Sequence, residues 1–470
     1  MPASAILTMV DGVRVAVHDS LDQVTTYVLR EQGDWFEDEI RFLRRLLEPG
    51  QHIIDIGANC GVYALSMAKV VGPTGRVWAF EPASATADLL AEGAAANGFE
   101  QVVVERHAVS ATSGVGRLAP GALPEMNAVC HDPVAATGGE TISLVSLDDC
   151  LASRGWRDIA FIKIDAEGEE ANVLAGGRRL LTEQSPLVQY ELQRDGEIQI
   201  ELVDTFETLG YAAYRLAPGP GMLVPFRRDA PKDVFQLNLF ACKPDRAARL
   251  AAAGLLVDTQ AMAESQEWFG DIARQAGALD AWSWRHTIAA LPYGTALAAG
   301  WEAGPHHGRH PDVEAALAFH AYSRDHHTPA PDRYVALRIS FQMFSNLCAT
   351  APSHLRLSSL ARVAHECGHR TIAIHALMQL SRSLLTQGSP DLGEPFLAPG
   401  ERFDVVAPGA DPGRWILAAV LEELERLNAW SSYFQPSLER LQLIRDLGFA
   451  GDEMQRRLSL VQTRGIPPSE

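Results

Sequence analysis

Hydrophobic residues recur with a regular period along the first half of the chain, and the period alternates between that of strands and that of helices. Residues 5–30 alternate apolar and polar side chains, which predicts short strands that form an N-terminal flap or hairpin. Asp34 is expected to cap a helix, because apolar side chains then fall on one stripe until Pro49 and Gly50 end it.

A β-branched run at residues 52–58 predicts a buried strand that turns sharply into a helix at Gly57 and Gly61. Residues 111–140 are rich in Gly, Ala, Pro and Thr and are expected to form a surface excursion over a substrate cleft. The alternation predicts a doubly wound α/β sheet, mainly parallel and closed by one antiparallel pair. The other expected elements are helix 61–71, strand 75–81, helix 84–97, strand 102–105, strand 159–165, helix 169–181, strand 186–192, helix 198–209, and a hairpin of strands 211–216 and 235–242 around the turn at 218–221.

Past about residue 244 the pattern becomes helical, rich in Ala and Leu, with no convincing strand. We therefore expect two domains, residues 1–244 and a mainly α-helical accessory domain at 245–470. One hairpin near residues 360–373 resembles a tetratricopeptide repeat, but no fixed period is established. A helical array suits a protein partner or a homo-oligomer surface. Helices are predicted at 246–254, 311–322, 331–349, 354–366, 370–386, 413–428 and 434–447.

Composition and charge narrow the function classes. The net charge of −19 over 470 residues argues against a general affinity for nucleic acid or anionic membranes. The sequence contains neither an apolar stretch of about 18 residues nor a secretion signal, so we expect a cytoplasmic protein without a membrane span. The six cysteines are scattered, which suits reduced thiols.

The glycine turn carries the first candidate chemistry. Gly57 and Gly61 permit a positive φ or the close approach of a ligand to the main chain. Glu81 follows Gly61 by twenty positions, a spacing at which an acidic residue binds ribose hydroxyls. The G-x-G-x-x-G fingerprint is absent, so NAD is the runner-up; S-adenosylmethionine fits better, because its cationic groups favour carboxylates such as Asp55. A purely structural glycine turn is the alternative.

With these residues in hand, the first half of the chain resembles the FkbM family of S-adenosylmethionine-dependent methyltransferases. The resemblance covers roughly residues 25–242, and the block Lys-Ile-Asp-Ala-Glu-Gly at 163–168 is its most specific part. The chain has Glu169 and Glu170 where the family pattern has Ala-Glu, a mild departure. The other matching pieces are residues 55–63, 79–82, 108–110 and 173–177.

The resemblance implies a Rossmann-like seven-stranded sheet and methyl transfer to a hydroxyl of a sugar, glycoconjugate or secondary metabolite. The acceptor is therefore expected to be a small molecule or a glycan. The positions expected to bind S-adenosylmethionine are Asp55, Gly57, Ala58, Asn59, Gly61, Glu81, Pro82, Ala108 and Val109.

Three residues are candidates for catalysis. Methyl transfer to oxygen needs positioning, and a base that removes the hydroxyl proton. Asp165 ends its predicted strand at the sheet edge where ligands bind, so it is the leading candidate for the base. Lys163 is expected to keep that carboxylate ionised or to orient the acceptor, and Glu167 to bind acceptor hydroxyls.

Further carboxylates leave alternatives open. Glu191 ends the next strand and Glu170 begins a helix, and both are candidates for binding substrate. A divalent ion such as Mg²⁺, held by Asp165 and Glu191, is an alternative use of the same oxygens. The glutamates at the helix start also suit the helix dipole without any ligand. Tyr63 and Trp35 are candidates for a cation–π contact with the sulfonium, although core aromatics are the more common case.

A second motif competes with this reading. His365-Glu-Cys-Gly-His369 matches the zinc motif H-E-x-x-H, and His375 stands where a third ligand belongs. Ile372 replaces the glycine that turns the chain toward the metal, and Gly368 is expected to break the helix. Both departures argue against a zinc peptidase, and the stronger alternative is a binding or assembly module with a catalytically weak methyltransferase fold.

Overall fold

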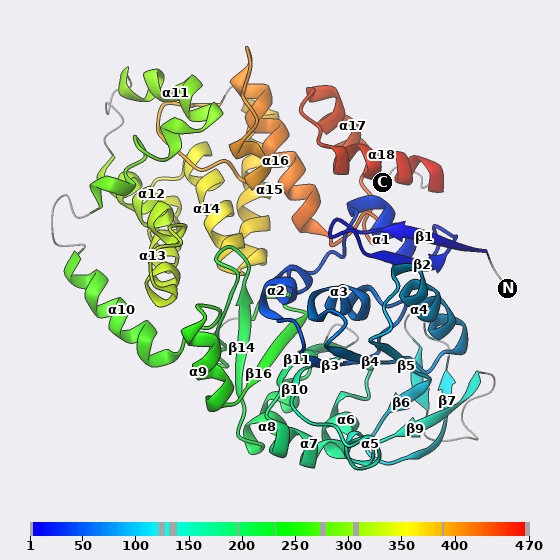
Figure 1. Ribbon diagram of the computed structural model, residues 1–470. Helices are drawn as coiled ribbons and strands as arrows, with labels where there is room; N and C mark the ends of the chain where they lie inside the picture. Colours follow the sequence, from blue (N-terminus) through cyan, green and yellow to red (C-terminus); the bar gives the residue numbers. More distant parts are fainter. Residues whose placement is uncertain are drawn as a thin grey trace. The chain divides into compact units, whose positions relative to one another are not determined.

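A computed structural model gives the fold of the protein (Figure 1). It describes residues 3–119, 121, 127–130, 139–194, 197–230, 232–272, 279–303, 310–387 and 390–465.

The described residues contain a main sheet of eight strands. The five strands from β11 to β5 in the order below are parallel, and β16 is antiparallel to both of its neighbours. The prediction of a doubly wound, mainly parallel sheet is confirmed, with one strand more than expected. The order is β15 (Met222–Pro225), β14 (Ala212–Ala217), β16 (Asn238–Cys242), β11 (Leu187–Glu191), β10 (Ile159–Ile164), β3 (His52–Ile56), β4 (Arg76–Phe80) and β5 (Val102–Glu105).

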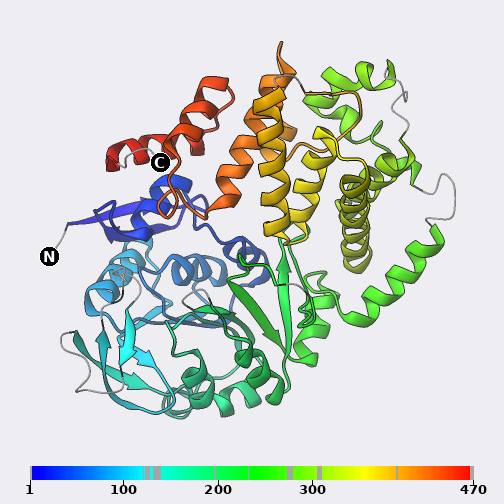
Figure 2. The same ribbon diagram turned by 180° about the vertical axis from the view of Figure 1, so that it is seen from behind.

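Helices cover both faces of this sheet, as Figures 1 and 2 show. The central strands are buried on both sides, which explains their nearly continuous apolar sequence. One face carries α2 (Asp38–Leu46), α3 (Val62–Val71) and α4 (Ser84–Asn97), and the other carries α5 (Leu147–Arg154), α6 (Glu170–Gly176), α7 (Arg178–Gln184) and α8 (Ile200–Thr208).

The N-terminal segment differs in part from the prediction. Strands β1 (Ser4–Thr8) and β2 (Arg14–His18) form the expected hairpin. The strand prediction is wrong for α1 (Val24–Gln32), whose first six residues are all buried, so its apolar positions follow no helical stripe. Asp34 does not cap α2, because the helix begins only at Asp38 with Glu37 at its N-cap position. The carboxylate of Asp34 instead binds the guanidinium of Arg44 at 2.6 Å.

Three further predictions needed correction. The excursion contains strands of a separate sheet, which its small residues concealed; its residues 120, 122–126 and 131–138 lie outside the described part. The predicted helix 169–181 is two helices, because Gly177 packs against Leu147 and interrupts it. The turn at 218–221 joins β14 to β15 instead of β16. The separate sheet has the order β6 (His107–Val109), β9 (Glu140–Val145), β7 (Gly114–Ala119) and β8 (Ala128–Cys130), and β12 (Gln193–Arg194) pairs with β13 (Glu197–Ile198).

The second half of the described chain is helical, as predicted. Its core is built around large buried aromatic side chains, including Trp284, Trp301 and Trp415. Helices α10, α11 and α18 were not predicted, although Met454, Leu458 and Val461 form an apolar stripe on the last of them. The bounds are α9 (Pro244–Ala252), α10 (Thr259–Ile272), α11 (Pro292–Ala303), α12 (Pro311–Ser323), α13 (Ala330–Thr350), α14 (His354–Glu366), α15 (Arg370–Gln387), α16 (Pro412–Asn428), α17 (Leu438–Leu447) and α18 (Asp452–Arg464).

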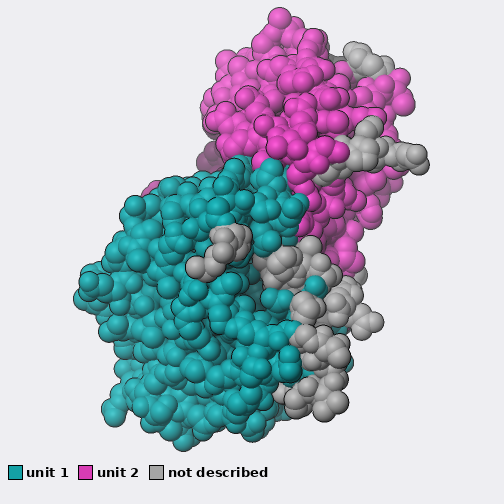
Figure 3. All heavy atoms as spheres, turned by 90° about the vertical axis from the view of Figure 1, so that its right-hand side faces the viewer, with its two compact units in different colours: residues 1–216, 225–230, 236–252 teal, residues 217–224, 231–235, 253–470 magenta. Residues whose placement is uncertain are grey.

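The chain forms two compact units, coloured separately in Figure 3. The sheet unit comprises Met1–Leu216, Pro225–Ala230 and Gln236–Ala252, and the helical unit comprises Ala217–Val224, Pro231–Phe235 and Ala253–Glu470. Between residues 217 and 252 the chain alternates between the two units, so the boundary after residue 244 stays a prediction. The tetratricopeptide-like repeat also stays a prediction.

Candidate active site

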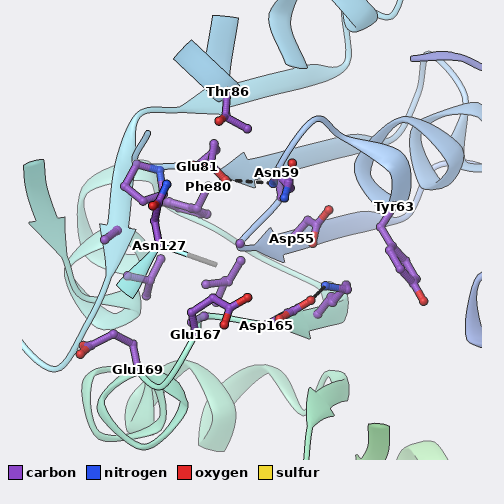
Figure 4. Close-up of a pocket in the computed structure, with 18 of the residues that line it drawn as sticks. Asp55, Asn59, Tyr63, Phe80, Glu81, Thr86, Asn127, Asp165, Glu167 and Glu169 are labelled. Carbon is purple, nitrogen blue, oxygen red and sulfur yellow. Dashed lines mark hydrogen bonds and ion pairs between the residues drawn. The ribbon is translucent and has the colours of Figure 1, made fainter. Parts of the chain in front are cut away.

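A cavity of about 130 Å³ lies in the sheet unit where β3, β4 and β10 end. The carboxyl ends of parallel strands are where open α/β sheets bind ligands. Figure 4 shows side chains from these strand ends and the loops after them around the cavity. Eleven of the predicted site residues line it, namely Asp55, Gly57, Ala58, Asn59, Glu81, Pro82, Ala108, Val109, Lys163, Asp165 and Glu167.

The glycine turn after β3 is tight because other parts of the chain pack closely against both glycines. Gly57 and Gly61 have φ values of 76° and 88°. A Cβ on Gly57 would lie 1.7 Å from the carbonyl oxygen of Asp165, and one on Gly61 would lie 2.2 Å from Leu90. Gly57 therefore lets the loop after β10 approach the turn. Gly61 lets α3 pack on α4, and it does not line the cavity.

Asp55 is a buried carboxylate that accepts no side-chain hydrogen bond from the described residues. It lies in β3 with no exposed surface, and neither carboxylate oxygen accepts a hydrogen bond of normal geometry from the described residues. Burial raises the pKa of Asp55 to about 6, although the nearby ammonium of Lys163 lowers it. An unpaired buried carboxylate is costly, and this one borders the cavity, so it is suited to a ligand that brings a positive charge.

Glu81 is held by the main chain at the end of β4. Its Oε2 accepts a hydrogen bond from the backbone N–H of Asn59 at 2.9 Å, and its Oε1 accepts one from that of Ala83 at 2.9 Å. Asn59 adopts a left-handed conformation with φ of 49°, which directs its N–H to the carboxylate. Burial raises the pKa of Glu81 to about 7 against the effect of these two donors. A carboxylate has about four acceptor sites, so ribose hydroxyls can still bind it.

Lys163 and Asp165 form an ion pair at the end of β10. Nζ of Lys163 donates to Oδ2 of Asp165 at 2.7 Å. The lysine side chain is 4% exposed, whereas that of Asp165 is 36% exposed and borders the cavity. Burial alone would lower the pKa of Lys163, but three neighbouring carboxylates, Asp165 first among them, raise it above its ordinary value. The lysine therefore stays cationic and fixes the carboxylate that is exposed.

The loop after Asp165 is held by Glu170. Its Oε1 accepts hydrogen bonds from the backbone N–H groups of Ala166 at 2.9 Å and Gly168 at 3.2 Å. Glu167, between them, adopts a positive φ of 49° and borders the cavity. Glu170 is buried and is not among the lining residues. The structure thus places Glu170 where it shapes the loop that presents Glu167.

Glu191 is also absent from the lining residues. Burial, followed by the negative charges of Asp165 and Glu167, raises its pKa to about 10. Among the described residues no group of three or more His, Cys, Asp or Glu side chains is placed to hold a metal ion. Asp165 uses one oxygen for Lys163, so the structure provides no support for the Mg²⁺ alternative.

Several lining residues were not predicted. Thr25 and Thr86 come from helices outside the strand ends, and Glu169 accepts hydrogen bonds from Ser110 at 2.7 Å and Asn172 at 3.1 Å. No sequence motif marks Thr25 or Thr86, because only the folded chain brings them to the cavity, whereas Glu169 directly follows the motif at 163–168. Leu118, Asn127 and Val129 also line the cavity, and they come from the excursion at 111–140 that was expected to lie over the cleft. The remaining unpredicted lining residues are Ile56, Val62, Phe80, His107 and Ala166.

Trp35 and Tyr63, the two aromatic candidates, also border the cavity. The cation over the Tyr63 ring is Lys163, whose Nζ lies 4.8 Å from the ring centroid. Both aromatics donate hydrogen bonds to Glu37, from Tyr63 Oη at 2.6 Å and from Trp35 Nε1 at 3.1 Å. Glu37 was not among the predicted site residues.

The zinc motif is used structurally in the helical unit. Helix α14 ends at Glu366, and Gly368 has φ of 79°, so the helix breaks inside the motif as predicted. Glu366 accepts hydrogen bonds from Arg362 at 2.6 Å and His320 at 2.9 Å. The ring of His369 packs on Phe341 at 4.9 Å.

The sheet unit thus combines a mainly parallel α/β sheet with a cavity at the carboxyl ends of its strands. Residues 55–216 match the family model of the methyltransferase FkbM domain. The resemblance predicted from the sequence is therefore confirmed over this segment, which is shorter than the predicted 25–242. No curated protein matches the chain.

Solved structures of methyltransferases are also similar to parts of the chain. A methyltransferase FkbM from Methylobacillus flagellatus KT is 18% identical, with a TM-score of 0.29, over 42% of this chain and 44% of that one. An S-adenosylmethionine-dependent O-methyltransferase from Thermotoga maritima is 16% identical, with a TM-score of 0.27, over 51% of this chain and 77% of that one. The chain thus spans less than half of the Methylobacillus protein. With TM-scores below 0.5, neither likeness transfers an activity to this chain.

In the described part of the chain, every helix is too short or too polar to cross a lipid bilayer.

Proposed function

We propose that the chain is an S-adenosylmethionine-dependent O-methyltransferase that acts on a hydroxyl of a sugar, glycoconjugate or secondary metabolite. The observation that carries the proposal is Asp55, a fully buried carboxylate beside the cavity whose oxygens accept no hydrogen bond of normal geometry from the described residues. The match of residues 55–216 to the FkbM domain supports it.

The residues present fit S-adenosylmethionine. Its sulfonium and amino groups are cationic, which complements the unpaired charge of Asp55, and its ribose hydroxyls suit the acceptor sites of Glu81. Asn59, Ala58 and Gly57 would place main chain along the molecule between these two carboxylates. When bound, this cofactor supplies a methyl group activated by a positively charged sulfur.

Asp165 then has the role of general base. Its Oδ2 accepts the hydrogen bond of Lys163, which leaves Oδ1 to take the proton of the acceptor hydroxyl. The positive charge of Lys163 lies 2.7 Å from the carboxylate and holds it in place for this role. The bound cofactor would supply the methyl carbon to the hydroxyl oxygen and keep the electron pair of its carbon–sulfur bond, while Asp165 would hold the proton that the hydroxyl loses.

The charge of the cavity favours an acceptor without negative groups. Its lining contains the carboxylates of Asp55, Glu81, Asp165, Glu167 and Glu169, against one lysine that is already paired. A phosphate or carboxylate on the acceptor would be repelled at this edge of the sheet. Glu167 is exposed to the cavity and is proposed to bind acceptor hydroxyls.

The test is methyl transfer from labelled S-adenosylmethionine into metabolites of cells that lack the protein. The wild-type protein is expected to label a hydroxyl-bearing compound, and the Asp165→Asn variant is expected to leave it unlabelled while binding the cofactor. Cofactor binding by the wild type without any labelled product would favour the binding or assembly module, and absence of cofactor binding would contradict both.

A further inference from the structure

Glu37 lies next to residues that line the cavity, and it accepts hydrogen bonds from one neighbouring residue and from two segments distant in sequence. Its Oε2 accepts from Tyr63 Oη at 2.6 Å and from Asn238 Nδ2 at 3.0 Å, and its Oε1 accepts from Trp35 Nε1 at 3.1 Å. These donors come from the first turn of α3, from β16 and from the loop before α2. The carboxylate is therefore fixed in one orientation.

Tyr63 connects this carboxylate to the ion pair. Its hydroxyl donates to Glu37, and the face of its ring lies 4.8 Å from Nζ of Lys163. The lysine in turn donates to Asp165 at 2.7 Å. A buried ammonium with one direct hydrogen bond from its own Nζ is free to turn unless its surroundings restrain it. The aromatic face provides that restraint by a cation–π contact, and the hydroxyl of Tyr63 is itself anchored by Glu37.

We propose that Glu37 is a positioning residue, which acts through Tyr63 to hold Lys163 and thereby orients the carboxylate of Asp165 toward the acceptor. This inference rests on the proposed role of Asp165 as the base. Glu37 does not line the cavity, so its effect reaches the reacting groups only through its neighbours. Glu37, Trp35 and Asn238 all lie outside residues 55–216, so this support comes from segments outside the matched domain.

Charge reinforces the geometry. The groups that face Lys163 are Asp165 beyond the end of its own strand, Asp55 on β3 and Glu37 before α2. All three are carboxylates, and together they keep the lysine cationic against the cost of its burial. Removing the charge of Glu37 would weaken the field that holds the ammonium on the tyrosine side, while Asp55 and Asp165 continue to attract it from the sheet side.

The chain offers an unusually clean way to observe this lysine. It contains four lysines in total, Lys69, Lys163, Lys232 and Lys243. Protein labelled with ¹³C and ¹⁵N in lysine alone gives four side-chain signals by NMR, and a Lys163→Met variant assigns the buried one. Its chemical shift reports the contact with the Tyr63 ring, and the exchange rate of its ammonium protons with water reports how firmly it is held.

Two variants and one matched control test the proposal. Glu37→Gln and Tyr63→Phe are expected to shift the Lys163 signal and to speed its proton exchange severalfold. The control is Asp38→Asn, which removes the neighbouring carboxylate; Asp38 binds Arg41 instead, so this variant is expected to leave the Lys163 signal and its exchange rate unchanged. Unchanged signals of the other three lysines confirm that each variant is folded. An unmoved Lys163 signal in Glu37→Gln, or an equal shift in Asp38→Asn, would overturn the proposal.

Calorimetry with S-adenosylmethionine separates this inference from the proposed function. Cofactor binding is expected to persist in Glu37→Gln, because Glu37 does not border the cavity. A severalfold loss of cofactor affinity in Glu37→Gln would overturn the positioning role, because the residue would then act on binding. Failure of the wild-type protein to bind the cofactor would instead contradict the proposed function, and the lysine measurement would remain valid.

Discussion

Two buried carboxylates, Glu366 in the helical unit and Asp55 in the sheet unit, have opposite surroundings. In the helical unit, Glu366 accepts hydrogen bonds from Arg362, His320 and Arg324, and their charges lower its pKa against the opposing effect of burial. In the sheet unit, Asp55 has no such partner, and burial raises its pKa to about 6. A paired buried charge holds a fold together, whereas an unpaired one costs stability and is typical of a binding site.

The largest expected effect concerns the carboxylate that performs the chemistry. Asp165→Asn is expected to reduce methyl transfer by about 10²–10⁴-fold, the usual contribution of a general base. Cofactor affinity should change little, because Asp165 faces the acceptor and Lys163. Rates of labelled product formation measure the first, and calorimetry measures the second. Full activity of the variant would remove Asp165 from the mechanism.

Glu366→Ala tests the paired side of the comparison. Removing Glu366 takes away the buried partner of Arg362 and His320 and leaves Arg362, among carboxylates, only its bond to Asp404 and a longer contact with Glu401. The free energy of unfolding is therefore expected to fall by about 3–5 kcal/mol. Urea unfolding followed by circular dichroism measures the change, and Glu401→Ala, whose side chain is 63% exposed, provides the control. A loss below about 1 kcal/mol would mean that the network contributes little.

Asp55→Asn tests the carboxylate of the sheet unit, and here the free energy of unfolding is expected to rise. The folded protein holds a proton on Asp55 up to pH of about 6, whereas the unfolded chain loses it near pH 4. Ionising Asp55 therefore costs stability progressively as pH rises through this window. At pH 7 the variant should be more stable by up to about 3 kcal/mol. Urea unfolding at pH 4 and pH 7 should show the gain in stability only at pH 7. An equal gain at pH 4 would mean that ionisation of the buried Asp55 is not its cause.

The smallest expected effect is the pH dependence of cofactor binding. The cationic cofactor needs ionised carboxylates, and the pKa values of Asp55 and Glu81 are raised to about 6 and about 7. Affinity should therefore rise between pH 5 and pH 8, with about tenfold from Asp55 alone. Calorimetry across this range measures it. An affinity that is flat with pH would mean that neither carboxylate contacts the cofactor.

Much of the sheet unit was predictable because its signals are local. The run from Ile53 to Gly61 predicts a strand, a turn and a helix in succession, and the Lys163 block identified the family. The same local signals placed Asp55, Glu81 and Asp165 at strand ends, where the structure has them around one cavity.

The rest depended on contacts between distant segments. Glu37 meets Tyr63 and Asn238 only in the folded chain, so no spacing in the sequence reveals its role. Helix α1 is buried over its first six residues, which removed the helical stripe from its pattern. From the sequence, Gly368 already predicts that the helix breaks inside the zinc motif that contains Glu366. The arginine partners of Glu366 become evident only from the packing of the helices.

The most direct test of the account is calorimetry of S-adenosylmethionine with the wild-type protein and the Asp55→Asn variant at pH 8. We predict binding at one site per chain for the wild type and at least about tenfold weaker binding for the variant, in keeping with the loss of a charged contact. Equal affinity of the two proteins, or no binding by either, would contradict the claim that the unpaired carboxylate at the end of β3 is there for the cofactor.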